Sequence, residues 1–287
     1  MSIQFKKATK KQSRLRMAIQ GPSGSGKTYS ALRIASNLAD KIAVGDTEYG
    51  SASLYASEFD FDVHEFRDNF HPDNAVSFLA EAAKAGYGAA IIDSVTHFWN
   101  GTGGFLELVD EDVRKQRARG GRGDSFAAWK EVTPVYNKLV HAILASPMHV
   151  FICMRAKQEY VKDTDERGKT VVRKVGLAAE MRDNFQYEMT VEGMLDMEHN
   201  LVIGKTRCNA IDGKIYHNPG KELADTLKQW LEDGAPAERD PKAEFNTWVK
   251  PYIAGEALTV DRVKAAVNAA NGDYDAARDA LIKEMSA

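Results

Sequence analysis

Hydrophobic residues along the chain recur with two different periods. Residues 15–19 carry large apolar side chains at every second position, which is typical of a strand, and residues 31–38 carry them at helical spacing. Nearly continuous apolar runs at 42–45, 89–92 and 149–154 are typical of parallel strands that are buried on both faces. Strands that alternate with helices in this way predict an α/β fold with a mainly parallel sheet.

Helix signals lie between these apolar runs. One helix is expected from Pro72 to a stop at Gly86, and another over 106–117 within a charged, glycine-rich stretch. Two separate helices are predicted after it, one opened by Ser125 and one by Thr133-Pro134, because each begins with a capping residue.

The hydrophobic period changes to two near the end of the core. Apolar side chains alternate at 187–191 and 201–203, and Asp212-Gly213 predicts the turn of a hairpin over 210–215. A helix over 223–231 follows. These features predict an antiparallel extension of the mainly parallel sheet.

Composition divides the chain into four parts. Residues 1–16 form a basic N-terminal segment without an acidic side chain, and residues 17–234 form the α/β core. Residues 235–241 are a linker by their glycine, alanine and proline content. Residues 242–287 predict a small helical domain, because their apolar residues fall on short helices.

Charge, cysteines and hydropathy narrow the class of protein. The formal net charge of −3 argues against a wholly basic surface, so contact with nucleic acid has to come from local patches. Cys153 and Cys208 lie in apolar or mixed strand patterns without a second ligand nearby, and they predict reduced packing residues. No apolar stretch reaches the roughly 18 residues of a membrane span. We therefore expect a cytoplasmic protein with no membrane partner.

A phosphate-binding loop with the pattern G-x-x-x-x-G-K-[ST] separates the first strand from the first helix. Its residues are Gly21, Pro22, Ser23, Gly24, Ser25, Gly26, Lys27 and Thr28. Glycines let successive N–H groups turn toward phosphate oxygens at the start of a helix. Lys27 is expected on the β- and γ-phosphates and the Thr28 hydroxyl on Mg²⁺, so the sequence predicts ATP and Mg²⁺ as cofactors.

Two carboxylates follow neighbouring strands of the predicted sheet. Asp93 ends the apolar run at 89–92, and Glu48 follows the run at 42–45. Ligands gather at the carboxyl ends of strands in open α/β folds. Phosphoryl transfer needs one group to order the Mg²⁺ shell and another to orient the attacking water. The sequence thus predicts Asp93 as a Mg²⁺ ligand beside Thr28, and Lys27, Glu48 and Asp93 as catalytic residues.

These segments resemble the ATPase core of RecA-type recombinases, in which the acid after the second strand is the catalytic base. The span from Phe5 to Gly234 is similar to the phage-encoded RecA-like P-loop ATPases that act in recombination by single-strand annealing. Further segments that carry this likeness are Ser94-Val95-Thr96-His97-Phe98-Trp99, Ser125-Phe126-Ala127-Ala128-Trp129, Met154-Arg155-Ala156-Lys157, Arg173-Lys174-Val175-Gly176 and Lys205-Thr206-Arg207-Cys208. The resemblance implies a RecA-like P-loop core.

The resemblance also implies roles for basic and terminal residues. Arg155 lies where the family has a residue that senses the γ-phosphate. Lys205 and Arg207 lie where cations reach the nucleotide of a neighbouring subunit, although a solvated surface strand explains them equally. Phe5 and Ala8 match a Phe-x-x-Ala element that joins successive protomers. The implied DNA-binding residues are Lys157, Lys162, Arg167, Lys169, Arg173 and Lys174; the alternative for this segment is packing at a subunit boundary.

The combined prediction is a Mg²⁺-dependent, DNA-stimulated ATPase for recombination or annealing. It binds single-stranded DNA and assembles into a ring or filament with ATP at the subunit boundary, in the host cytoplasm if a phage encodes it. The resemblance adds a single-stranded-DNA-binding protein as a partner. Two alternatives stay open: a ring helicase or motor on the same core, and an annealing module that ATP switches with little turnover.

Overall fold

The computed structural model describes residues 5, 7–164, 170–235, 241–254 and 258–285. The chain forms two units, residues 12–234 and residues 1–11 with 235–287. The larger unit contains the β-sheet, and the smaller unit contains α7 (Pro241–Ala254), α8 (Val260–Ala269) and α9 (Tyr274–Met285).

A nine-stranded sheet organises the larger unit, in the order β3-β2-β4-β5-β1-β7-β8-β9 with β6 paired to β5. The strands are β1 (Arg16–Gly21), β2 (Ile42–Asp46), β3 (Asp62–Glu65), β4 (Ala89–Asp93), β5 (His149–Thr164), β6 (Thr170–Ala179), β7 (Val191–Leu195), β8 (Asn200–Thr206) and β9 (Ile215–His217). Neighbours from β3 to β7 in this order run parallel, whereas β8 and β9 run antiparallel. The predicted α/β class with a mainly parallel sheet is confirmed.

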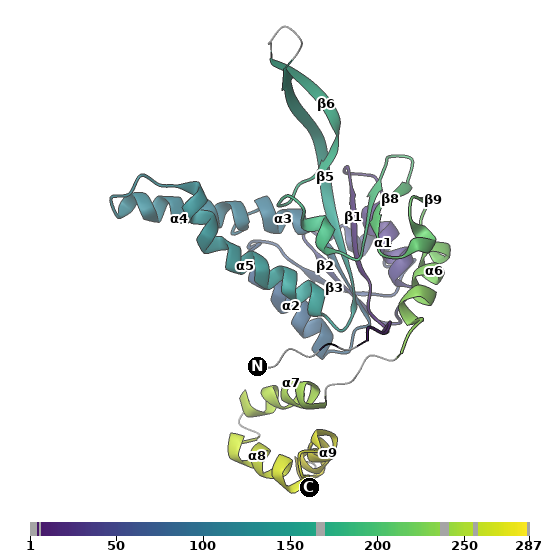
Figure 1. Ribbon diagram of the computed structural model, residues 1–287, viewed down its shortest axis with the longest axis vertical. Coiled ribbons are helices and arrows are strands. Elements are labelled where there is room, and N and C mark those ends of the chain that lie inside the picture. The colour runs from purple at the N-terminus through teal and green to yellow at the C-terminus, as the bar shows by residue number, and fades with distance from the viewer. Residues whose placement is uncertain (1–4, 6, 165–169, 236–240, 255–257, 286–287) are drawn as a thin grey trace. The chain divides into compact units, whose positions relative to one another are not determined.

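Helices cover both faces of this sheet (Figure 1). They are α1 (Lys27–Ala35), α2 (Pro72–Lys84), α3 (Val95–Asn100), α4 (Phe105–Ala118), α5 (Ser125–Ala145) and α6 (Lys221–Glu232), with short 3₁₀ helices η1 (Ala52–Tyr55), η2 (Phe185–Glu188) and η3 (Asn209–Ile211). Past the sheet, β5 continues outward and pairs with β6 as a two-stranded arm (Figure 1).

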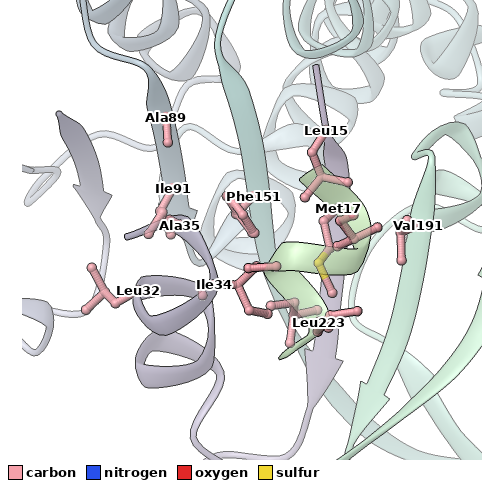
Figure 2. Close-up of a cluster of buried hydrophobic side chains, with 14 of the residues drawn as sticks. Leu15, Met17, Leu32, Ile34, Ala35, Ala89, Ile91, Phe151, Val191 and Leu223 are labelled. Atoms are coloured by element: carbon pink, nitrogen blue, oxygen red, sulfur yellow. The ribbon is translucent and has the colours of Figure 1, made fainter. Parts of the chain in front are cut away.

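Each face of the sheet has its own hydrophobic core, because successive strand residues point to opposite sides. On one face, Met17, Ile91 and Phe151 pack with side chains of α1 and α6 (Figure 2). On the other face, Ile92 and Ile152 pack with side chains of α2, α4 and α5. Truncation of one such buried residue to alanine typically costs about 2–5 kcal/mol. The two cores fix the strand ends that carry the polar side chains described below.

Some predicted elements differ from the structure. The two helices expected from Ser125 and Thr133 form one continuous helix, α5, with Pro134 in its interior. The Thr133 hydroxyl donates to the Trp129 carbonyl oxygen at 2.7 Å in the turn that precedes the proline. Asp124 is the N-cap, and its carboxylate accepts from the Phe126 N–H at 2.9 Å. The prediction of a second helix was wrong because Thr133, a residue type that often caps a helix start, here lies inside a continuous helix.

Two further differences lie in the antiparallel region. Residues 185–188 form η2, and the strand begins only at Val191. Residues 209–211 form η3, although the turn at Gly213 does link β8 to β9 and has φ 65°. Tyr187, Met189 and Val191 occupy alternate positions and so imitate a strand, although Tyr187 belongs to η2 and is exposed, whereas Met189 is buried.

The smaller unit has a separate hydrophobic core. Phe245, Val249 and Leu258 pack there with Ala277 and Leu281. In the same unit the Ala235 N–H donates to the Lys10 carbonyl oxygen at 3.0 Å. Among the helices described in either unit, none combines the length and apolar character needed to cross a membrane.

Candidate functional site

The phosphate-binding loop joins the end of β1 to the start of α1. Gly24 and Gly26 have φ of 83° and 88°, a left-handed conformation that residues with a Cβ rarely adopt. A Cβ on Gly21 would lie 2.5 Å from the Leu195 carbonyl oxygen, so this position has no room for a side chain. The glycines of the motif are therefore required by the backbone that forms the loop.

Polar groups inside the loop are held close to its backbone. The Lys27 side chain is largely buried, and its Nζ donates to the Pro22 carbonyl oxygen at 2.8 Å. The Ser25 N–H donates to the same carbonyl oxygen at 3.3 Å. The Ser25 hydroxyl is buried and has no hydrogen-bond partner within the described structure. A phosphate would offer acceptors to both the ammonium and the hydroxyl.

Thr28 and Asp93 meet beside this loop. The Thr28 hydroxyl donates to Oδ2 of Asp93, which is the last residue of β4. Burial raises the pKa of Asp93 to about 6, while the hydrogen bond from Thr28 opposes that rise. A hydroxyl and a carboxylate in contact are oxygen ligands of the kind that Mg²⁺ takes. Among the described residues there is no cluster of three or more His, Cys, Asp or Glu side chains for a metal, so Mg²⁺ would also need oxygens from a bound nucleotide.

Glu48 lies at the end of β2, where a tight turn fixes its backbone. The Asp46 carboxylate accepts from the Glu48 N–H at 2.5 Å and from the Ala52 N–H at 3.1 Å. The side chain of Glu48 is paired with Arg155, whose Nε and Nη2 lie 3.0 and 2.8 Å from Oε1. The structure therefore brings Arg155 to the predicted catalytic base.

A buried network holds the tips of β2 and β4 in register. The Thr47 hydroxyl accepts from the Ser94 N–H at 2.7 Å and lies 2.6 Å from Nδ1 of His97. The Thr47 N–H donates to the Asp93 carbonyl oxygen at 2.8 Å. The Asp93–Ser94 peptide bond is cis. Burial, and then the positive charge of Arg155, lower the pKa of His97, which favours a neutral ring. These contacts fix the separation of the two strand ends that carry Glu48 and Asp93.

A cavity of about 410 Å³ lies against the loop and joins these groups. Lys27, Thr28, Glu48 and Asp93 all line it. A larger hollow of about 800 Å³ lies beside β3 and α2, and none of the phosphate-binding residues line it. The smaller cavity is therefore the candidate nucleotide site.

Several residues of this cavity were not anticipated from the sequence. They are Tyr29, Ser30, Arg33, Ser51, Leu54, Tyr55, His199 and Asn218. Tyr29 and Tyr55 pack edge to face, with ring centroids 5.4 Å apart, and form an aromatic wall. The position of Tyr55, seven residues after Glu48, matches no motif. His199 and Asn218 reach the site only because β7 pairs with β1 and the chain continues from β7 into β8 and β9.

The predicted DNA-binding residues follow Arg155 on the arm. Lys157 is exposed and lies 3.9 Å from Glu180. Lys162 lies on β5, and Arg173 and Lys174 lie on β6, but their side chains are outside the described part of the structure. Arg167 and Lys169 lie outside the described residues. The predicted positions Lys157, Lys162, Arg173 and Lys174 thus lie on the two paired strands β5 and β6.

Of the remaining predicted site residues, Lys205 and Arg207 do not line the nucleotide cavity, and Phe5 and Ala8 belong to the smaller unit. Lys205 donates to the Tyr187 carbonyl oxygen at 2.5 Å and to that of Met189, and burial followed by the charge of Arg207 lowers the pKa of Lys205. Arg207 is exposed and follows the end of β8. Phe5 is 96% exposed, and Ala8 is exposed as well.

The strand–loop–helix geometry, with its lysine, hydroxyl and buried carboxylate, defines a P-loop nucleoside triphosphatase fold. The sequence profile of a family described as an AAA domain matches residues 13–224. The chain belongs to this AAA domain family, and an AAA-type ATPase domain is therefore present. No curated protein matches the chain.

Proposed function

We propose that this chain is a RecA-like ATPase of phage type that binds single-stranded DNA and promotes recombination or strand annealing. The convergence of Lys27, Thr28, Glu48 and Asp93 on one cavity carries the ATPase part of this proposal. The resemblance to annealing-type ATPases and the basic projections of the larger unit support the DNA part.

In the proposed reaction the phosphate-binding loop and Lys27 hold the triphosphate. Mg²⁺ bound through Thr28 and Asp93 would supply charge neutralisation at the phosphates. Glu48 orients the attacking water and accepts its proton. Because Arg155 neutralises Glu48 in the structure, we propose that Arg155 leaves this carboxylate for the γ-phosphate when ATP binds. Such an exchange would free the base only in the presence of substrate.

Two projections support contact with single-stranded DNA. The arm of β5 and β6 carries the cations already described. The last turn of α4 exposes Arg117, the segment that joins α4 to α5 exposes Arg119 and Arg122, and the neighbouring Phe126 is 85% exposed. Cations bind the phosphate backbone without regard to sequence, and an exposed aromatic ring offers a surface for a base to stack on.

We further propose that the chain assembles through its N-terminal segment. Phe5 is exposed, as an element that inserts into a neighbouring copy must be. The proposed receiving surface is edge strand β3, whose adjoining hollow is lined by Phe66 and Phe78 and by acidic side chains that suit the basic segment around Phe5. Arg207, which is exposed, suits the role of a cation that acts in a neighbour's site better than Lys205, whose ammonium already binds two carbonyl oxygens.

The central test compares ATP hydrolysis with and without single-stranded DNA. We expect Mg²⁺-dependent hydrolysis that DNA stimulates, and DNA affinity that falls as salt rises. Absence of both stimulation and DNA binding at low salt would reject the proposed function. Directional strand separation would instead favour the ring helicase or motor.

Glu48→Gln separates turnover from binding. We expect this variant to retain ATP binding and to lose hydrolysis, because the amide cannot accept the proton of water. Glu222→Gln, at an exposed residue of α6 that lines neither hollow, is the matched control and should behave as wild type. If annealing survives in Glu48→Gln, the module that ATP switches with little turnover is the better description.

A further inference from the structure

The turn between β7 and β8 lies against the phosphate-binding loop. A Cβ on Gly21 would meet the Leu195 carbonyl oxygen at 2.5 Å. A Cβ on Gly26 would meet Nδ1 of His199 at 3.2 Å, at the other end of the same turn. Two glycines of the loop therefore face the end of β7 and the turn after it; the approach at Gly21 leaves no room for a side chain, and the approach at Gly26 is tight at a φ of 88°.

His199 makes a polar contact with the loop. Its Nδ1 lies 2.9 Å from the carbonyl oxygen of Ser25. A carbonyl oxygen only accepts hydrogen bonds, so Nδ1 carries the proton and donates. Both the neutral ring protonated at Nδ1 and the charged ring satisfy this contact. The interaction therefore does not depend on a positive charge at His199.

The contact determines the direction of one loop N–H. The Ser25 carbonyl and the Gly26 N–H belong to the same planar trans peptide unit, so they point in opposite directions. We propose that His199 is a positioning residue for the nucleotide: by holding the Ser25 carbonyl, it keeps the Gly26 N–H directed into the phosphate cradle. This inference rests on the proposed nucleotide binding.

The turn that carries His199 is built to hold the ring in place. The Asp196 carboxylate accepts from the backbone N–H groups of Glu198 at 3.0 Å and Asn200 at 2.8 Å, and from the Asn200 side chain at 3.0 Å. These hydrogen bonds lower the pKa of Asp196. The His199 carbonyl oxygen accepts from the Asn218 N–H at 2.9 Å. With φ 63°, His199 has a conformation that asparagine and glycine also adopt.

The test measures the affinity of the full-length chain for a fluorescent ATP analogue with Mg²⁺. His199→Asn keeps a donor at the position of Nδ1, because Nδ2 of asparagine is bonded to Cγ in the same way. His199→Gly and His199→Ala remove the donor, and glycine does so without strain at this φ. His141→Ala removes an exposed histidine of α5 that does not line the cavity, and serves as the control.

We expect His199→Gly and His199→Ala to weaken binding about tenfold, which corresponds to ~1.4 kcal/mol. His199→Asn should stay within about twofold of wild type, a difference of ~0.4 kcal/mol, and His141→Ala should match wild type. Melting temperatures without nucleotide should change little, because His199 is exposed. Should one deletion variant fail to fold, the other and His199→Asn still decide the matter.

Two results would overturn the inference. One is that His199→Gly and His199→Ala bind the ATP analogue as tightly as wild type. The other is that His199→Asn binds it as weakly as His199→Gly and His199→Ala do. Lys27→Ala is measured alongside. If wild type itself binds no nucleotide, the proposed function fails, whereas wild-type binding that is insensitive to His199 removes only the positioning role.

Discussion

Neutralising Asp93 should stabilise the nucleotide-free protein at alkaline pH while abolishing ATP turnover. Burial raises the pKa of this carboxyl from 3.8 to about 6. Each pKa unit is worth about 1.4 kcal/mol, so ionised Asp93 lowers the free energy of unfolding by about 3 kcal/mol. Bound Mg²⁺ would offset this destabilisation, because its positive charge would compensate for the buried negative charge of Asp93.

The pH dependence has a definite direction. Below about pH 4 the carboxyl is protonated in both the folded and the unfolded chain, so it contributes no difference. Between about pH 4 and 6 the unfolded chain ionises first, and stability falls as pH rises. Above pH 6 the full destabilisation is present. Asp93→Asn resembles the protonated acid, because it is neutral and still accepts from the Thr28 hydroxyl.

The assay is urea unfolding of wild type and Asp93→Asn in EDTA from pH 4 to 8. We expect the stability of Asp93→Asn relative to wild type to rise by about 3 kcal/mol across this range, and Mg²⁺ with ATP to stabilise wild type alone. Asp40→Asn, at an exposed residue, controls for the loss of a surface charge. A difference between wild type and Asp93→Asn that is independent of pH would refute the reasoning.

Three further substitutions test other parts of the fold and site. Gly21→Ala should lower the free energy of unfolding, measured by urea titration, by about 1–3 kcal/mol, because the new Cβ meets a backbone carbonyl. Gly86→Ala is the control: the space there is open and only the φ of 80° is strained, so comparing the two variants separates the steric clash from backbone strain. Arg16→Met should lower the free energy of unfolding by about 3–5 kcal/mol, because the buried guanidinium of Arg16 donates to the backbone carbonyls of Leu15, Leu144, Ser146 and Met148. The thermal melting of exposed Arg14→Met should change far less, and equal shifts would contradict this account. Thr47→Val should reduce kcat and lower the free energy of unfolding by about 1–3 kcal/mol, since the Ser94 N–H loses its acceptor. Thr47→Ser keeps the hydroxyl, so its kcat and stability should match those of wild type. Full activity in Thr47→Val would show that the network is dispensable.

The nucleotide site could be predicted from sequence to the extent that it depends on local geometry. The spacing from Gly21 to Thr28 encodes a loop backbone, and Asp93 and Glu48 end apolar runs that are recognisable as buried strands. Arg155 was expected near phosphate, and the structure places it on Glu48. His199 was not anticipated, because its role depends on the turn between β7 and β8 lying beside a loop that is more than 170 residues away in sequence.

Helix α5 shows a different limit of prediction from sequence. Thr133-Pro134 has the composition of a helix start, yet it lies within α5 because the helix before it already packs Ala128 and Val132 into the core. Tertiary packing outweighs a local signal there. Similarly, buried Phe185 packs into the core from the 3₁₀ helix η2, and buried Met189 from the residue that follows it, rather than from a strand.

The continuity of β5 has a mechanical consequence. This single strand of 16 residues starts at the centre of the sheet and ends in the arm, a span of about 50 Å at 3.3 Å per residue. Arg155 lies on it where the sheet gives way to the arm. An extended backbone resists stretching, so a pull on the outer end of β5, at Thr164, would act along the chain on Arg155. One continuous strand thus links the arm mechanically to the side chain that pairs with Glu48.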